Sequence, residues 1–404
     1  MTNTAALDVF LHDRRIGSLV HLDGDGSIFS FDSDYVADAT RPTLSLSYKD
    51  SLGGLIDTPR AYRTRIEPFF SNLLPEGTLR DFLARRAGVK ALREFPLLTQ
   101  LGEDLPGAVK VLPVDNVKPA FDPVSDERVD EAITRTMRFS LAGVQLKFSG
   151  IRGGAKNAGL TIPASGTGGD WIVKLPSVRH PDVPEAEFAA MMLGRQLGID
   201  VPEIDLIPIE AIEGLPEGIQ RYGQSAYAIR RFDRSPDGTV HIEDFAQVFG
   251  VYPDEKYKNA SYRQLLAVLA IETDETSVVE FVRRLTYCVL IGNGDMHLKN
   301  WSLAYPDRHR PILAPAYDLL STVAYLPEDD AALKFHRSRQ WDSFSYAELA
   351  AIADKARLPS HLVVSTARET VALFDQLWDQ QHSHLPFPRE VVEAIDRHRK
   401  KLVV

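Results

Sequence analysis

Cysteine is almost missing from this chain, which has Cys288 as the single one in 404 residues. One thiol cannot form an internal disulfide, and it excludes any zinc or iron–sulfur site built from several cysteines. Disulfides belong to oxidising compartments, so this composition suits a reducing cytosol. Cys288 lies in an apolar run, and we expect it in the core.

The chain also lacks a long hydrophobic run. No segment approaches the roughly 18 consecutive apolar residues that a membrane-spanning helix needs. The first ten residues, MTNTAALDVF, have neither the basic start nor the continuous apolar stretch of a secretory signal. We therefore expect a cytoplasmic protein with no membrane as its partner.

Positive charge is in short supply. The sequence has 46 Lys and Arg against 56 Asp and Glu, a net charge of −10 and a pI near 5.6. This balance argues against a chain that coats nucleic acid through its overall field. The basic cluster from Arg397 to Lys401 is typical of the exposed end of a terminal helix. The remaining composition is that of a globular protein with one large core or two or three smaller ones.

The N-terminal part predicts a small β-rich domain over residues 1–115. Alternating residues predict two strands within 7–22, and further strands at 27–31, 43–48 and 107–113. The segment 69–88 predicts a loop and then a helix, which begins near Gly77 or Thr78 and stops at Gly88. Between Pro113 and Asp126 the periodicity disappears, and we place a linker there.

Two further domains are expected, over residues 126–235 and 236–404. The first should contain strands at 171–177, 204–209 and 225–232, with a helix at 184–197. The second should contain helices at 241–249, 261–271, 276–291, 345–355, 361–378 and 388–401, and a β pair at 301–303 and 311–313.

The stretch IGNGDMHLKN, residues 291–300, places several polar side chains after a Gly-Asn-Gly turn. Asp295 precedes Asn300 by five positions, the spacing of a protein-kinase catalytic loop, in which the acid orients a substrate hydroxyl and the amide binds Mg²⁺. A solvated loop, with glycine and asparagine for turn geometry, would use the same residues. Taken alone, this common spacing favours the solvated loop.

The order of the surrounding elements changes this balance. Lys174 lies inside an apolar strand, where its ammonium group needs a partner unless that face is exposed. Glu187 on the next helix has the place of the ion-pair partner of a kinase lysine, and Asp318 follows the loop. Upstream, a glycine turn within 139–154 could lay backbone N–H groups over phosphates or form an ordinary β-hairpin. Together, this order predicts a kinase active site.

Several stretches carry a resemblance to a known family: SLAGVQLKF, WIVKLPS, RRFDR, GNGDMHLKN and PAYDL, with FFSNLLPEG and LGEDLPGAVKVLP in the N-terminal half. They resemble the HipA-like serine/threonine kinases, toxins of bacterial type II toxin–antitoxin pairs, over most of the chain. The resemblance implies an α/β (α+β) protein-kinase-like bilobal fold, with a β-rich N-terminal subdomain, an ATP lobe and an all-α C-terminal lobe. It also implies ATP and Mg²⁺ as cofactors.

The resemblance assigns roles to individual residues. It makes Asp295 the catalytic base, Asn300 and Asp318 the Mg²⁺ ligands, and Lys174 the lysine on the ATP phosphates. Lys299 could meet the γ-phosphate as a point charge. The implied phosphate loop consists of Ala142, Gly143, Val144, Gln145, Leu146 and Lys147, and the implied nucleotide lining consists of Phe232, His297 and Tyr317.

Three further positions need separate comment. Ser140 matches the loop serine that such kinases autophosphorylate, a modification that ejects the loop and switches the kinase off. Arg230 departs from the family, which usually has Glu there, so a side-chain role is in doubt although a backbone contact to adenine could survive. Glu187 as partner of Lys174 comes from general kinase logic more than from the family's motifs.

The implied partners are a HipB-like helix-turn-helix antitoxin, through which DNA would be bound, and a protein substrate. That substrate is expected among translation components such as an aminoacyl-tRNA synthetase. Two alternatives stay open: a catalytically silent kinase-fold regulator that acts with a DNA-binding antitoxin, and a small-molecule kinase.

Overall fold

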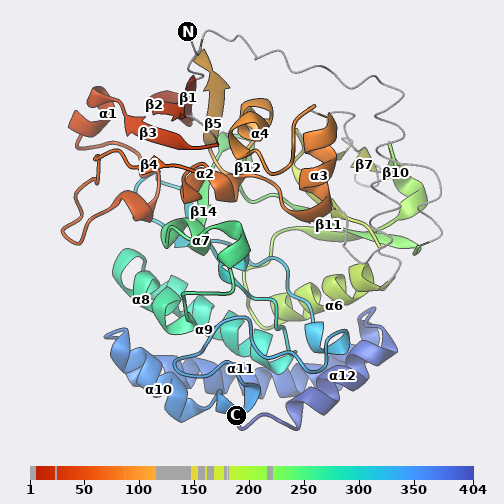
Figure 1. Ribbon diagram of the computed structural model, residues 1–404. Helices are drawn as coiled ribbons and strands as arrows, with labels where there is room; N and C mark the ends of the chain where they lie inside the picture. Colours follow the sequence, from red (N-terminus) through yellow and green to blue (C-terminus); the bar gives the residue numbers. More distant parts are fainter. Residues whose placement is uncertain are drawn as a thin grey trace. The chain divides into compact units, whose positions relative to one another are not determined.

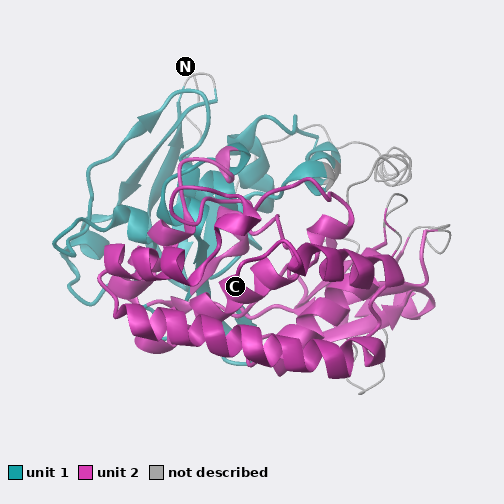
Figure 2. Cartoon of the chain, turned by 90° about the horizontal axis from the view of Figure 1, so that it is seen from below, with its two compact units in different colours: residues 1–146, 233–254, 304–310 teal, residues 147–232, 255–303, 311–404 magenta. Residues whose placement is uncertain are grey.

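The computed structural model describes residues 6–22, 25–86, 88–114, 147–152, 160–161, 168–176, 180, 182–215 and 222–404. The chain forms two compact units that interleave along the sequence (Figure 2). Unit 1 comprises Met1–Leu146, Asp233–Asp254 and Ala304–Arg310, and unit 2 comprises Lys147–Phe232, Glu255–Leu303 and Pro311–Val404. The expected boundaries at residues 115, 126 and 235 stay a prediction. Among the described residues, no helix combines the length and apolar character that crossing a bilayer requires.

Unit 1 contains a five-stranded antiparallel sheet in the order β4-β3-β2-β1-β5 (Figure 1). In β1 the side chains of Leu7, Val9 and Leu11 are buried and alternate with half-buried ones, as a strand with one face on the core requires. The strands predicted within 7–22, 27–31 and 107–113 are confirmed. Their bounds, with the short β4, are β1 Ala6–Leu11, β2 Arg14–His21, β3 Ser27–Phe31, β4 Ala61–Tyr62 and β5 Val109–Pro113.

The helices of this unit confirm one prediction and correct another. A helix does begin at Gly77, and Gly88 follows its end with a left-handed φ of +69°. The loop predicted before it is wrong, because Phe69, Phe70 and their neighbours form a buried helix that opens on Pro68. Proline suits a first helical turn, where its missing N–H is not needed. The helices are α1 Ser33–Ala37, α2 Pro68–Leu73, α3 Gly77–Arg86 and α4 Glu94–Leu101.

Residues 43–48 do not form the predicted strand. The segment ends in a 3₁₀ helix, η1 Leu46–Tyr48. The Ser45 hydroxyl donates a hydrogen bond to Glu243 Oε2 at 2.5 Å, and the Leu46 N–H donates to Glu243 Oε1 at 3.0 Å. The Ser45 hydroxyl and the Leu46 N–H therefore bind the buried Glu243 carboxyl group and not a neighbouring strand.

The helix predicted over residues 241–249 is wrong in its first half. The chain forms β14 His241–Asp244 before the one-turn helix α7 Phe245–Val248. His241 and Glu243 are both fully buried and alternate with half-buried residues, which is the two-residue period of a strand. Asp244 then forms a capping box with Gln247, and this box sets the start of the helix.

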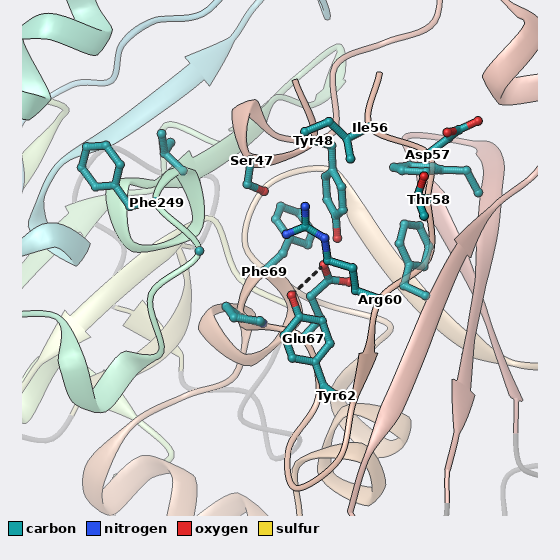
Figure 3. Close-up of a pocket in the computed structure, with 15 residues that line it drawn as sticks. Ser47, Tyr48, Ile56, Asp57, Thr58, Arg60, Tyr62, Glu67, Phe69 and Phe249 are labelled. Carbon is teal, nitrogen blue, oxygen red and sulfur yellow. Dashed lines mark hydrogen bonds between the residues drawn. The ribbon is translucent and has the colours of Figure 1, made fainter. Parts of the chain in front are cut away.

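A pocket of about 250 Å³ lies within unit 1 (Figure 3). Aromatic rings supply much of its wall, and the Glu67 carboxyl group reaches into it, where the Tyr62 hydroxyl donates a long hydrogen bond of 3.5 Å. Burial raises the pKa of Glu67 to about 7, against the opposing effects of Tyr48, Tyr62 and Arg60. The aromatic residues of the lining are Phe29, Phe31, Tyr48, Tyr62, Phe69 and Phe249.

This carboxyl group should make stability depend on pH. The folded-state pKa of Glu67 is above its ordinary value. The stabilisation that Glu67 contributes to the folded state is therefore fully present below about pH 4.5 and is lost as pH rises through about 7. Glu67→Gln should remove up to about 3 kcal/mol of that loss. We expect the melting temperature of the variant to fall less than that of the wild type between pH 5 and 8.

A matched control is Asp57→Asn, which changes an exposed carboxylate that lines the same pocket. That variant should melt like the wild type at both pH values. An equal pH dependence in Glu67→Gln and the wild type would contradict the prediction.

Unit 2 contains a six-stranded sheet in the order β10-β7-β6-β8-β11-β9, in which only the β10–β7 pair is parallel. Helix α6 Val183–Gln196 packs against β9 and β11. The strands predicted at 171–177, 204–209 and 225–232 and the helix at 184–197 are confirmed. The strands are β6 Lys147–Arg152, β7 Leu160–Thr161, β8 Trp171–Lys174, β9 Ile204–Pro208, β10 Ile212–Glu213 and β11 Ser225–Arg230.

The rest of unit 2 is mainly helical and confirms the remaining helix predictions. Helix α9 is largely buried, since α8, α11 and α12 all pack on it. Cys288 in α9 is only 2% exposed, as expected of a core residue. The helices are α8 Tyr262–Glu272, α9 Glu275–Leu290, α10 Tyr346–Lys355, α11 Ser360–Gln381 and α12 Arg389–Arg399. The remaining short strands that the structure describes are β12 Arg234–Ser235, β13 Gly238–Thr239, β15 Ser302–Tyr305 and β16 Ile312–Leu313.

Candidate active site

The loop that carries Asp295 begins where α9 ends. Gly292 has φ +65°, and a Cβ atom there would lie 2.4 Å from Val323 Cγ2, so this turn requires glycine. The buried Asn293 side chain accepts a hydrogen bond from the Asp295 N–H and donates one to the Asp318 carbonyl oxygen, both at 3.1 Å. One asparagine therefore ties the Asp295 loop to the segment that carries Asp318.

The Asp295 side chain is 52% exposed, so a substrate could reach it. The Tyr257 hydroxyl donates a hydrogen bond to its Oδ1. Desolvation by the surrounding protein nevertheless raises the pKa of Asp295; the Tyr257 hydrogen bond opposes the rise and Asp318 adds to it. A carboxylate with a raised pKa is a better proton acceptor than an ordinary aspartate.

Lys174 projects from β8 and is only 3% exposed. Its ammonium group donates to Glu187 on α6 and to Asp318 Oδ1. Lys147 of β6 pairs directly with Lys174, so both side chains leave the same face of the sheet. Lys147 Nζ lies 3.1 Å from Asp318 Oδ2. One carboxylate thus bridges two lysines from neighbouring strands.

The charges in this cluster stabilise one another. Burial lowers the pKa of Lys174, but attraction by Asp318 and then Glu187 outweighs burial and raises it to about 12. Burial also disfavours ionised Asp318, yet Lys147 and Lys174 hold its pKa well below its usual range. Burial raises the pKa of Glu187, and the attraction of Lys174 opposes this. At neutral pH, Asp318 is therefore an ionised carboxylate that lies between the Lys147 and Lys174 side chains.

Asp318 also has an unusual backbone conformation. Its φ of +56° lies in the left-handed region that a residue with a side chain seldom adopts. Such conformations store strain and persist where surrounding contacts hold them. Here the Asn293 bond to its carbonyl oxygen and the two lysines on its carboxylate supply those contacts.

The remaining polar residues of the loop lie close to Asp295. The Asn300 amide donates to the Asp295 carbonyl oxygen at 2.8 Å, which uses only the donor side of the amide. His297 is 5% exposed, and its Nε2 lies 3.9 Å from Asp295 Oδ1. Lys299 is half-buried, and its carbonyl oxygen accepts a hydrogen bond from the Tyr317 hydroxyl at 2.8 Å.

Phe232 and Tyr317 contact each other, whereas Arg230 pairs with Glu203. The two rings stack with centroids 5.9 Å apart. The Arg230 N–H donates to the Glu203 carbonyl oxygen at 2.8 Å, and its guanidinium lies 3.4 Å from the Glu203 carboxylate. Ser140 and the predicted loop residues Ala142, Gly143, Val144, Gln145 and Leu146 lie outside the described residues; of that set, the structure describes Lys147.

The donor set fits Mg²⁺ bound together with a phosphate better than a metal held by protein alone. Within the described ranges, no three His, Cys, Asp or Glu side chains gather as a metal site. Asp318 and Asn300 offer a carboxylate and an amide oxygen, the hard ligands that Mg²⁺ prefers. Mg²⁺ commonly binds one or two such groups and completes its coordination with substrate phosphates and water.

Two residues with evident roles in this geometry were missed by the sequence reasoning. Asn293 lies inside the GNGD turn, where its residue type by itself indicates only turn geometry. Tyr257 lies 38 residues before Asp295, in a polar stretch with no motif. A spacing rule could have drawn attention to Asn293, but only the folded chain brings Tyr257 to Asp295.

Two family models match the chain. The model described as the HipA N-terminal domain matches residues 7–112, and the one described as the HipA-like C-terminal domain matches residues 139–378. The second match alone covers more than half of the chain.

Individual relatives agree with these models. The Sinorhizobium fredii protein named "Putative kinase Y4dM" is 53% identical over 399 residues, which cover 98% of this chain and 97% of the relative. The Shewanella oneidensis "Serine/threonine-protein kinase toxin HipA" is 27% identical over 90% of this chain and 86% of its own. A solved complex of Shewanella oneidensis HipA, HipB and operator DNA matches with a TM-score of 0.72 at 23% identity, over 98% of this chain and 95% of the other. The shared fold confirms the predicted kinase-like architecture.

Proposed function

The chain belongs to the HipA family, and from this membership we propose that it is a serine/threonine-protein kinase that transfers the γ-phosphate of ATP to a protein hydroxyl. One observation carries the proposal: the Asp318 carboxylate is bound by Lys147 and Lys174 and is tied through Asn293 to the Asp295 loop. Phosphoryl transfer depends on positioning and charge neutralisation, which this arrangement supports.

In this proposal, Asp295 takes the proton of the acceptor hydroxyl as that oxygen attacks the γ-phosphorus. Its exposure and its raised pKa support that role. Lys174, oriented by Glu187, and Lys147 bind phosphate oxygens once ATP is present. Both ammonium groups also pair with Asp318, so their binding to phosphate oxygens would leave this carboxylate available to a cation.

Asn300 and Asp318 would hold Mg²⁺, which neutralises phosphate charge when bound. The stacked rings of Phe232 and Tyr317 offer an apolar wall for adenine. We assign His297, which lies on the Asp295 loop, to the same nucleotide lining. Lys299 remains a candidate for the γ-phosphate. At position 230 we propose a role for the backbone carbonyl oxygen alone, since the Arg230 N–H and guanidinium both pair with Glu203.

We assign Ala142 to Lys147 to a phosphate loop and Ser140 to its regulation. Phosphorylated Ser140 would carry nearly two negative charges beside a loop that holds phosphates, and repulsion would then weaken ATP binding. Autophosphorylation at this serine would therefore switch the kinase off.

One relative supports the proposed antitoxin partner. The Shewanella HipA occurs in a complex with HipB and operator DNA. We propose that this chain acts as the toxin of such a pair, with a HipB-like helix-turn-helix antitoxin that supplies DNA binding. Its substrate is proposed to be a translation component such as an aminoacyl-tRNA synthetase.

The deciding experiment follows the label of γ-³²P-ATP. The full chain is incubated with Mg²⁺, labelled ATP and bacterial lysate, and proteins are then separated from small molecules. We expect label on the chain itself and on a small set of lysate proteins, and Ser140→Ala should lose the self-label while keeping transfer to the others.

Other outcomes would contradict the proposal. Label confined to small molecules would favour a small-molecule kinase. Absence of transfer, in a folded chain that binds the antitoxin, would favour a silent regulator with a kinase fold.

A further inference from the structure

Tyr257 lies against the loop that carries the candidate base, although the two are far apart in sequence. Its hydroxyl donates to Asp295 Oδ1, and its ring meets His297 edge to face, with centroids 4.9 Å apart at 86°. The neighbouring Lys256 carbonyl oxygen accepts the Leu298 N–H at 3.2 Å. The Tyr257 segment is therefore bound to both the side chains and the backbone of the loop.

The Asp295 backbone is well held, but its carboxylate has little support. Its N–H donates to Asn293, and its carbonyl oxygen accepts bonds from Asn300 and from the His297 N–H. Within the described ranges, Tyr257 is the one residue that donates a hydrogen bond to the carboxylate. Among these residues, the phenol of Tyr257 is therefore the main constraint on the orientation of this carboxylate, with His297 Nε2 farther off at 3.9 Å from Oδ1.

The contact leaves room for an acceptor hydroxyl. Tyr257 occupies Oδ1 alone, and about half of the Asp295 side chain remains exposed. A substrate hydroxyl can thus approach the carboxylate while the phenol stays in place. Tyr257 is itself 45% exposed, so no rearrangement of the core is needed to reach this region.

We propose that Tyr257 is a positioning residue that holds the Asp295 carboxylate in the orientation in which it accepts the proton of the substrate hydroxyl. The inference rests on the kinase function proposed above. In the transfer step, the O–H bond of the acceptor breaks, its proton goes to the carboxylate, and the acceptor oxygen forms the new bond to the γ-phosphorus as ADP leaves. Tyr257 keeps its own proton throughout and acts through Asp295.

The test is Tyr257→Phe, which removes only the hydroxyl and keeps the ring against His297. The initial rate of γ-label transfer into lysate protein is measured at varied ATP concentration. We expect kcat to fall about tenfold or more, because a misaligned base loses near-attack geometry, while the KM for ATP stays unchanged. A purely structural role would instead change KM and the melting temperature together.

Tyr346→Phe is the matched control, since that hydroxyl on α10 makes no hydrogen bond in the part of the chain that the structure describes. It should leave kcat and KM at the wild-type values. An unchanged or raised kcat in Tyr257→Phe would overturn the inference and leave the kinase function standing. A wild-type chain without any transfer would refute both, and a lowered melting temperature with a changed KM would reduce Tyr257 to a structural residue.

Discussion

Asp295→Asn is expected to lower phosphoryl transfer about 10³-fold while the binding of ATP with Mg²⁺ stays as in the wild type. Asparagine keeps the shape of the side chain and can still accept the Tyr257 hydrogen bond through its amide oxygen. It cannot take up the proton of an acceptor hydroxyl. Label transfer from γ-³²P-ATP measures the loss of activity, and titration calorimetry measures ATP binding.

The control is Asp379→Asn, an isosteric change at an exposed aspartate of α11. This variant should transfer phosphate at the wild-type rate. If Asp295→Asn retained more than about a tenth of the wild-type rate, Asp295 could not be the base, since a positioned general base contributes about 100-fold or more.

Asp318→Asn is expected to weaken Mg²⁺-dependent ATP binding by about 100-fold or more and thereby to abolish transfer. The substitution removes an anionic oxygen that a hard cation needs, and it leaves Lys147 and Lys174 without their shared counter-charge. Titration calorimetry with ATP, with and without Mg²⁺, measures this effect. The two aspartates are thus distinguished, because Asp295→Asn should bind ATP with Mg²⁺ as the wild type does, whereas Asp318→Asn should bind it much more weakly.

The same variant should also lower the free energy of unfolding by about 3 kcal/mol at neutral pH. Because the folded-state pKa of Asp318 is depressed, its stabilisation is present above its unfolded-state pKa and is lost only in strong acid. The difference from the wild type should therefore shrink below about pH 4. Asp375→Asn breaks a surface pair with Arg399 and should change stability by about 0.5 kcal/mol, with ATP binding intact. Unaltered Mg²⁺-dependent binding in Asp318→Asn would refute the ligand assignment.

The errors in the predicted elements have a common physical cause. Residues 43–48 look like a strand, but Ser45 and Leu46 donate to Glu243, which lies about 200 positions away. The alternation of residues 241–244 is hidden in a polar stretch, because the buried positions there are His241 and Glu243. Period and propensity identify an element when apolar burial drives it. They fail when a distant partner makes a polar side chain suitable for the core.

The candidate site likewise contains residues that the sequence identifies and residues that only the fold brings together. Lys174, Glu187, Asp295, Asn300 and Asp318 could be named in order from residue type and spacing. The pairing of β6 with β8, which brings Lys147 beside Lys174 and both to Asp318, depends on strand register, which no local pattern specifies. Tyr257 has no sequence signal at all.

By itself, the sequence determined the family, the kinase-like fold and the order of the polar residues along the chain, because these depend on residue type, periodicity and motif spacing. Only the tertiary structure decided which lysines share the Asp318 carboxylate, which group supports the Asp295 side chain, and in which direction each pKa moves. Those properties depend on distance and burial, and distance between residues far apart in the sequence is set by folding alone.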